Sequence, residues 1–163
     1  VTSLKIEGRM KSAYYVATVV SAYRAALDSY LKDPENYEFK QEWYDELCKA
    51  SHREFTHGFF YQKPSSKDQN YLTSDYVREY SFIGVVLGVD EETGETIVQQ
   101  RNKFCVGDEI EIMSPGEPFY TETVSSMKDE EGNAIESAPH PKQEVRIPFR
   151  RVPAKHSILR KRK

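Results

Sequence analysis

The chain has 163 residues, of which 38% are hydrophobic and 30% are charged, and its formal net charge is −3. This length fits one domain or two small ones, and no apolar run approaches the roughly 18 residues that suggest a membrane-spanning helix. The composition therefore suits a soluble protein with a modest core and excludes a helical membrane protein.

The first stretch, LKIEGRMKS, covers residues 4–12 and has two interpretations. IEGR is a common engineered protease site, so residues 6–9 could be a remnant without a structural role. Alternatively, Leu4–Ile6 is the last strand of a larger domain. The two interpretations differ in whether the first 60 residues carry chemistry.

Two helices are predicted after this stretch. Ser12 is a suitable N-cap, and the apolar residues behind it recur every three or four positions until Asp33-Pro34, where proline disfavours a helix. A second helix is expected from about Phe39 to Ala50. Two helices and one short strand cannot build much of a core, so residues 1–60 are interpreted as the C-terminal end of a catalytic domain. The apolar positions of the first helix are Val16, Val19, Val20, Tyr23, Leu27, Tyr30 and Leu31.

Residues 61–79 are polar, lack a sustained period and are predicted to be a linker. Residues 80–163 instead show about six short β-rich segments separated by turn signals, which is typical of a small antiparallel barrel or sandwich. The predicted fold class is therefore α+β, with a helical N-terminal part and a small antiparallel β-barrel. The expected strands are Tyr80–Val89, Thr96–Arg101, the segment within residues 107–113, Phe119–Met127, the alternating residues 145–149, and Ile158 with Leu159.

Charge is unevenly distributed along the β-rich part. Nine acidic residues and one basic residue, Lys128, lie between Asp108 and Glu136. Nine basic residues and one acidic residue, Glu144, lie between Lys142 and Lys163. Such asymmetry suggests an anionic partner for the basic end, although a solvated tail explains the final RKRK equally well.

Three segments resemble a known family. They are KIEGRMKSAYYVATVVSAYRAALD at residues 5–28, SHREFTHGFF at 51–60, and SILRK at 157–161. Together they resemble the C-terminal part of the U32 peptidase family, the collagenase-like protease group, over nearly the whole chain and in order. The resemblance favours the domain-end interpretation of the first stretch, since an engineered remnant would not be followed by the family's own helix.

The resemblance implies a parent enzyme with a barrel-like α/β catalytic domain, whose last strand and helix are residues 1–31. Family members were named as peptidases, and others act in RNA hydroxylation or quinone biosynthesis. A C-terminal β-domain is most similar to the tRNA-hydroxylation branch, and the β-domain itself resembles the second domains of translation elongation factors. The family's cysteine-rich signature is absent here. The resemblance therefore implies that any iron–sulfur cluster or metal of the parent is held by residues upstream, with no cofactor in this chain.

Four residues are candidate contributors to the parent's catalytic site: Glu7, Arg9, His52 and Arg53. Glu7 and Arg9 would follow the last barrel strand, at the face where such barrels place active sites, or would simply close the barrel mouth as an ion pair. His52 and Arg53 would anchor polar groups near the substrate cleft. No catalytic residue is assigned in this chain itself, which is expected to be inactive alone.

The sequence gives weaker support for a zinc site or a reactive thiol. His52 and His57 are five residues apart, about 140° around a helix, so the HRExxH segment does not fit a zinc-binding HExxH motif and no metal site is predicted. Cys48 and His52, four apart, could form an activated thiol pair, but an inert thiol is the simpler interpretation. Cys48 and Cys105 show no CxxC spacing and indicate reduced thiols in a cytoplasmic protein.

The basic C-terminal part is the main candidate for binding RNA, most plausibly tRNA. Phosphate binding needs several cations along a groove, and stacking on Phe104, Phe119 or Tyr120 could add to it, although core packing is their default role. Alternative partners are a polypeptide substrate recognised along strand edges, the rest of the catalytic domain, or a second copy in a homodimer. The predicted RNA-binding residues are Arg146, Arg150, Arg151, Lys155, Arg160, Lys161 and Arg162.

Overall fold

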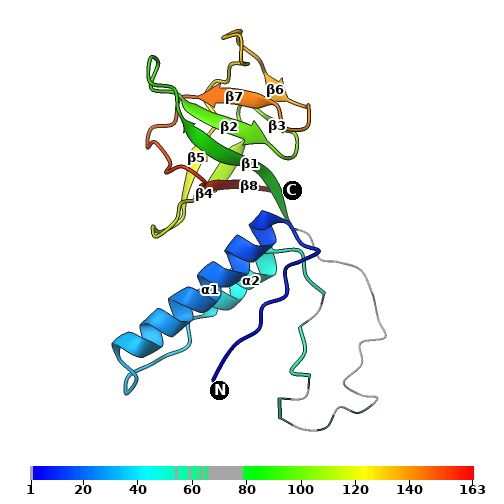
Figure 1. The fold of residues 1–163 in the computed structure, drawn as a ribbon, viewed down its shortest axis with the longest axis vertical. Coiled ribbons are helices and arrows are strands. Elements are labelled where there is room, and N and C mark those ends of the chain that lie inside the picture. The colour runs from blue at the N-terminus through cyan, green and yellow to red at the C-terminus, as the bar shows by residue number, and fades with distance from the viewer. Residues whose placement is uncertain (1, 54, 59, 62, 64, 66–78) are drawn as a thin grey trace. The chain divides into compact units, whose positions relative to one another are not determined.

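The computed structural model divides into two compact units, Val1–Glu79 and Tyr80–Lys163 (Figure 1). We call them the helical unit and the sheet unit. The structure describes residues 2–53, 55–58, 60, 61, 63, 65 and 79–163. Most of the predicted linker at 61–79 lies outside the described residues. No helix among them is both long and apolar enough to cross a membrane.

Both predicted helices are present in the helical unit. α1 spans Ala13–Lys32, and the Oγ atom of its N-cap Ser12 accepts a hydrogen bond from the N–H of Tyr15 at 3.3 Å. The helix ends directly before Asp33-Pro34, as the sequence predicted. α2 spans Gln41–Lys49, which is slightly shorter than the predicted range.

The two helices pack on each other through one side of α1. Tyr14 is buried and its hydroxyl donates to the carbonyl of Lys49 at 2.8 Å, which ties the start of α1 to the end of α2. Trp43 is the buried aromatic residue of α2. The opposite side of α1 remains exposed although it is apolar; its residues are Val16, Val20, Tyr23, Leu27, Tyr30 and Leu31.

The strand predicted at residues 4–6 is not formed. Residues 2–7 have no regular secondary structure, and Leu4 is 53% exposed. A strand is stabilised by hydrogen bonds to a neighbouring strand, and no strand is found elsewhere among the described residues of the helical unit. The segment therefore has the apolar pattern of a strand without the partner that would fix it.

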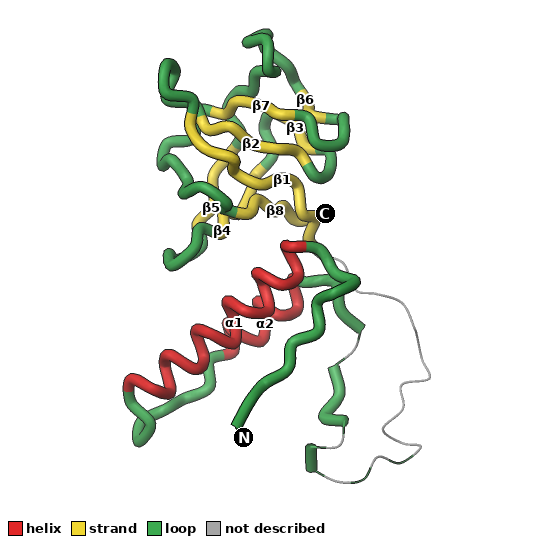
Figure 2. Tube along the Cα trace, viewed as in Figure 1, coloured by secondary structure: helices red, strands yellow, loops and turns green. Residues whose placement is uncertain are grey.

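The sheet unit contains a six-stranded antiparallel sheet in the order β5-β4-β8-β1-β2-β7, which Figure 2 shows curling around its core. A separate pair, β3 with β6, was not predicted, because two-residue strands leave no period in the sequence. The strands are β1 Tyr80–Val89, β2 Thr96–Gln100, β3 Phe104–Cys105, β4 Glu109–Met113, β5 Tyr120–Thr123, β6 Ser137–Ala138, β7 Glu144–Ile147 and β8 Ile158–Arg162.

The sheet is a half-barrel, so the α+β class is confirmed, whereas a closed barrel is not formed. Within residues 80–163, the edge strands β5 and β7 form no ladder with each other. Strand β1 bends where its pairing register with β8 shifts between Phe82 and Gly84. A Cβ atom at Gly84 would lie 2.7 Å from Cγ1 of Val98, so glycine lets the neighbouring strand approach closely. The fully buried core includes Ile83, Val98, Phe104, Ile110, Ile112, Ile147 and Leu159.

Candidate nucleic-acid interface

The seven basic residues predicted to bind RNA do not form one surface. Four of them form ion pairs with carboxylates of the sheet unit: Arg146, Arg151, Arg160 and Lys161. The other three, Arg150, Lys155 and Arg162, are exposed, and no carboxylate pairs with them among the described residues. Only part of the predicted set is therefore available to a phosphate backbone.

Arg160 lies in the core rather than on the surface. It is 0% exposed, and its guanidinium pairs with Glu111, which is directly opposite it where β4 pairs with β8. The rings of Tyr80 and Phe119 lie 5.4 and 5.5 Å from the guanidinium carbon. The charge is thus compensated inside the protein, and Phe119 contacts this cation instead of presenting its face for base stacking.

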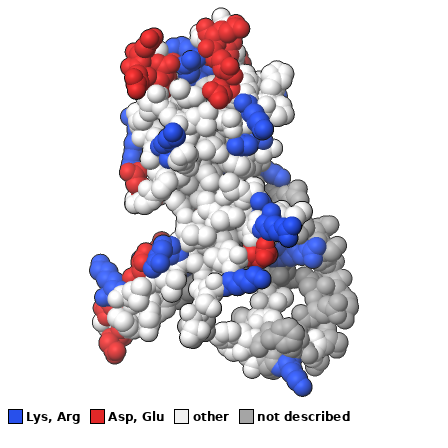
Figure 3. All heavy atoms as spheres, viewed as in Figure 1, with Lys and Arg blue, Asp and Glu red and all other residues white. Residues whose placement is uncertain are grey.

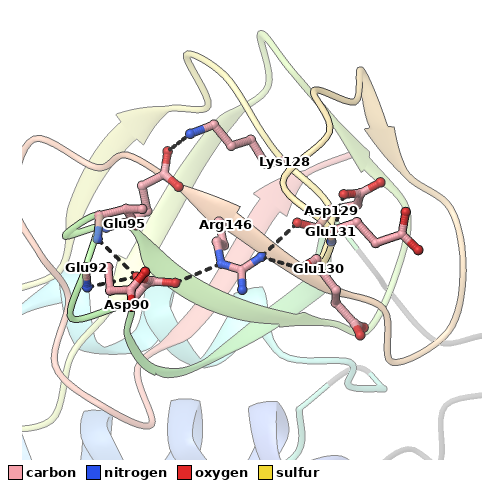
Figure 4. Close-up of polar contacts among 9 residues, drawn as sticks. Asp90, Glu92, Glu95, Lys128, Asp129, Glu130, Glu131 and Arg146 are labelled. Atoms are coloured by element: carbon pink, nitrogen blue, oxygen red, sulfur yellow. Dashed lines mark hydrogen bonds and ion pairs between the residues drawn. The ribbon is translucent and has the colours of Figure 1, made fainter.

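Arg146 joins two turns of the sheet unit (Figure 4). Its Nε donates to the Asp90 carboxylate at 3.0 Å, and its Nη1 donates to the carbonyls of Asp129 and Glu130 at 3.0 and 2.8 Å. These contacts give Arg146 a structural role. Arg150 does not share a strand with Arg146, because β7 ends at Ile147 and Arg150 lies in the following loop.

Acidic residues gather at the end of the sheet unit formed by the turns at 90–95 and 129–133 (Figure 3). Asp90 accepts hydrogen bonds from the N–H groups of Glu92 and Thr93, each at 3.0 Å. The Thr93 N–H contributes most to holding the pKa of Asp90 below its ordinary 3.8, and Arg146 adds to it. The pKa of Asp129 is lowered mainly by the side chain of Asn133. This end of the unit would repel RNA.

Acidification is expected to loosen these two turns. A lowered pKa means that the stabilisation is present above the unfolded value, near 3.8, and is lost as pH falls through the folded value. The melting temperature of the sheet unit should therefore fall between about pH 5 and pH 2.5, and fall less in the D90N/D129N variant. Circular dichroism melts at the two pH values measure the melting temperature of each protein. An equal fall in the unchanged chain and in the variant would contradict the role of Asp90 and Asp129.

The loop at 148–156, between β7 and β8, carries two of the exposed cations on a fixed backbone. The Glu122 carboxylate on β5 accepts the backbone N–H groups of Arg150 and Arg151, both at 3.0 Å. The Arg151 guanidinium lies 4.6 Å from the Tyr120 ring centre and pairs with Glu117 at 2.6 Å. Arg150 and Lys155 therefore project from a loop that is already ordered.

Glu122 is a positioning residue that the sequence did not reveal. In YTET it looks like one more acidic residue of the stretch that should repel RNA, and its partners are 28 and 29 residues away. Phe104, a proposed stacking residue, is fully buried in the core. Tyr120 is partly buried under Arg151.

In the helical unit, Glu7 and Arg9 form a local turn instead of a strand end. The N–H of Arg9 donates to the Glu7 carboxylate at 2.9 Å in an exposed loop. His52 and Arg53 both line a cavity of about 550 Å³ between α1 and the segment after α2. The catalytic contributions predicted for these four residues stay predictions.

The thiol pair suggested by Cys48 and His52 is not formed on one helix face, because α2 ends at Lys49. The Nδ1 atom of His52 lies 2.7 Å from the carbonyl of Ala50, to which it donates. Burial, together with nearby Asp45, raises the pKa of the Cys48 thiol. A raised pKa reduces the thiolate fraction, so the environment does not activate Cys48 as a nucleophile.

The described residues do not fit an iron–sulfur cluster or a metal ion. Cys48 lies in the helical unit and Cys105 in the sheet unit, and both are free. No group of three or more His, Cys, Asp or Glu side chains comes together as a ligand set in the described part of the chain. Cluster ligation needs several thiolates converging on one site, which these positions do not supply.

Comparison with known proteins gives matches along the chain. The family model described as "Peptidase family U32" matches residues 1–70, and "Peptidase family U32 C-terminal domain" matches residues 78–160. The tRNA hydroxylation protein P1 of Bacillus subtilis is 41% identical over 163 residues, which is 100% of this chain and 39% of that protein. The tRNA hydroxylation protein P of Haemophilus influenzae is 36% identical over 116 residues, which is 71% of this chain and 25% of that protein.

A solved structure also matches. The crystallised C-terminal domain of a U32 peptidase homologue from Geobacillus thermoleovorans is 41% identical, with a TM-score of 0.47, and the match covers 50% of this chain and 99% of that one. The chain spans about two fifths or less of the length of the two tRNA hydroxylation proteins.

Proposed function

The chain belongs to peptidase family U32, and from this premise we propose that it is the C-terminal part of an enzyme that hydroxylates tRNA, in which the sheet unit grips the tRNA. The family match includes the accessory C-terminal domain, and relatives along the whole chain are named tRNA hydroxylation proteins. We place the enzyme in the cytoplasm, where tRNA and reduced thiols are found.

The loop at 148–156 is the observation that carries the proposal. It presents Arg150 and Lys155 to solvent without paired carboxylates, while Glu122 and Arg151 hold its backbone against β5. An ordered loop loses little conformational entropy when a ligand binds, so its cations cost less to position on phosphates. Arg162, exposed at the end of β8, adds a third cation.

The charge distribution of the sheet unit restricts tRNA binding to one side of the unit. The acidic turns at 90–95 and 129–133 would repel a phosphate backbone, and Arg146 and Lys128 between them are paired with Asp90 and Glu95. We therefore propose that the tRNA contacts the unit away from these turns. We also propose that the sheet unit is related to elongation-factor second domains. As a small half-barrel, it would dock RNA on one face.

The helical unit is proposed to complete a catalytic domain whose remaining part lies upstream. Apolar residues cover the exposed side of α1, including Leu27, Tyr30 and Leu31, which are 39%, 47% and 67% exposed. A contiguous apolar surface of this kind is stabilised when another element covers it. We propose that the upstream part also holds any cluster or metal, since the residues described here do not form such a site.

The test removes the three exposed cations together. Fluorescence anisotropy with labelled bulk tRNA should show that R150Q/K155Q/R162Q binds about 10- to 100-fold more weakly than the unchanged chain at moderate salt. With fewer phosphate contacts, binding releases fewer counterions from the tRNA and gains less free energy. The slope of log affinity against log salt should also become shallower, by about one for each cation.

A matched control is R101Q/K103Q/K142Q, which removes three other exposed cations of the sheet unit and the same net charge. It should reduce tRNA affinity much less than the first variant. Equal weakening in both variants would mean that tRNA senses only net charge, and the assignment to Arg150, Lys155 and Arg162 would be wrong.

A second candidate function rests on the open sheet. β5 is an edge strand of the sheet, and an exposed strand edge can bind an extended polypeptide, whereas the edge of β7 is bridged to Lys128 at Arg146. This is the arrangement expected if the unit recognises a peptide substrate of a U32 peptidase. Binding of denatured collagen without salt-dependent tRNA binding would favour it.

A further inference from the structure

The ion pair between Arg151 and Glu117 is open to water. The Nη2 atom of Arg151 lies 2.6 Å from the Oε2 atom of Glu117, and the two side chains are 51% and 43% exposed. In the pair between Lys161 and Asp108, the corresponding values are 24% and 25%. An exposed pair contributes little to stability, because water solvates both charges when the pair separates. Arg151 can therefore leave Glu117 at a small cost in free energy.

The backbone of Arg151 is held independently of this ion pair. Its N–H donates to the Glu122 carboxylate at 3.0 Å, and its carbonyl accepts a hydrogen bond from the Tyr120 hydroxyl at 3.4 Å. The guanidinium lies 4.6 Å from the centre of the Tyr120 ring, and the face of that ring attracts the cation with or without Glu117. A released Arg151 side chain would thus still project from an ordered loop, beside Arg150.

A phosphate group is a chemical substitute for the Glu117 carboxylate. A guanidinium binds carboxylates and phosphates with the same forked arrangement of N–H donors. An RNA backbone that is already bound by Arg150 and Lys155 would hold further phosphates close to the same loop, which raises their effective concentration at Arg151. A single phosphate ion lacks this advantage and has to compete with a carboxylate that belongs to the chain itself.

We propose that Glu117 is a displaceable anion at Arg151, and that a backbone phosphate takes its place when tRNA binds. The inference rests on the proposed tRNA function and adds to it a control of affinity by Glu117. Glu117 keeps Arg151 from binding isolated anions, whereas a polyanion held by the neighbouring cations displaces it. The released carboxylate attracts a cation from the solvent, which offsets part of the counterion release, so the exchange adds less to the salt dependence than an unpaired cation does.

The test begins with E117Q, which removes the competing charge and keeps the size of the side chain. This variant should bind labelled bulk tRNA about 2- to 5-fold more tightly than the unchanged chain in fluorescence anisotropy at moderate salt, because Arg151 no longer has to leave a carboxylate. The matched control is E109Q, which removes one negative charge from an exposed position on β4. E109Q should change tRNA affinity much less than E117Q does.

A second pair of variants separates displacement from simple repulsion of phosphate by Glu117. R151Q should weaken tRNA binding, and E117Q/R151Q should bind no more tightly than R151Q, because the two side chains act through one contact. An equal gain from E117Q with and without Arg151 would mean that Glu117 only repels phosphate. An unchanged or weaker affinity in E117Q would mean that Glu117 does not compete for Arg151. Either result would overturn the inference, and circular dichroism melts verify that each variant is folded.

The exchange at Arg151 and the proposed tRNA grip fail in different measurements. Binding that falls with salt and depends on Arg150, Lys155 and Arg162, while E117Q behaves like E109Q, would overturn the exchange alone. A tRNA affinity that is insensitive to salt, or that R150Q/K155Q/R162Q leaves unchanged, would overturn the grip and the exchange with it.

Discussion

Replacing Glu111 by alanine is expected to lower the free energy of unfolding of the sheet unit by about 3–5 kcal/mol. Arg160 is fully buried, and the Glu111 carboxylate pairs with it across β4 and β8. Removing one partner of a buried pair leaves the other charge with less compensation, which costs more than the pair itself contributes. Tyr80 and Phe119 would still contact the guanidinium but carry no negative charge.

The control for this variant is E109A, because Glu109 lies two residues earlier on the same strand and is exposed. It should change the free energy of unfolding by no more than about 0.5 kcal/mol. Urea titrations followed by NMR signals of Ile83 and Ile112 measure the sheet unit directly, whereas Trp43 reports on the helical unit. A loss below about 1 kcal/mol for E111A would show that Arg160 is compensated by other groups.

Replacing Phe104 by alanine is expected to destabilise the sheet unit by about 3–5 kcal/mol. The ring is 0% exposed within the core cluster, so its removal loses buried apolar contacts and leaves a cavity that the curled sheet can fill only in part. The same urea titration measures the effect.

This variant also separates two roles that the sequence allowed for Phe104. V89A is the comparison, since Val89 is 39% exposed at the end of β1 and should cost far less. If F104A keeps its stability but loses tRNA affinity, Phe104 would be a stacking residue and its placement in the core would be wrong.

Local signals predicted most of the elements. Ser12 and Pro34 predicted the two ends of α1, because an N-cap and a proline act on the backbone within one helical turn. The continuous apolar run of β1 predicted both ends of that strand. The unformed strand at residues 4–6 had the right apolar pattern but no described neighbour to pair with. The open edge between β5 and β7 depends on how far the sheet curls, which no local pattern encodes.

The predicted RNA-binding site stays a prediction, and the structure shows that several of its cations already pair with carboxylates. Arg146 and Arg160 look like surface cations in the sequence, but their partners Asp90 and Glu111 are 56 and 49 residues away. Alternation along a strand indicates which face a side chain occupies, not whether a carboxylate on a neighbouring strand neutralises it. The contact of Lys11 with Ser51 was not predicted, because these residues are 40 positions apart and only the fold brings them together.

The most direct test of the proposed function is the affinity of this chain for bulk tRNA at several salt concentrations between about 50 and 200 mM. With three phosphate-contacting cations, we expect the plot of log affinity against log salt to have a slope of about −2 to −3. An absence of binding at the lowest salt, or an affinity that does not change with salt, would contradict the role of the sheet unit in gripping tRNA.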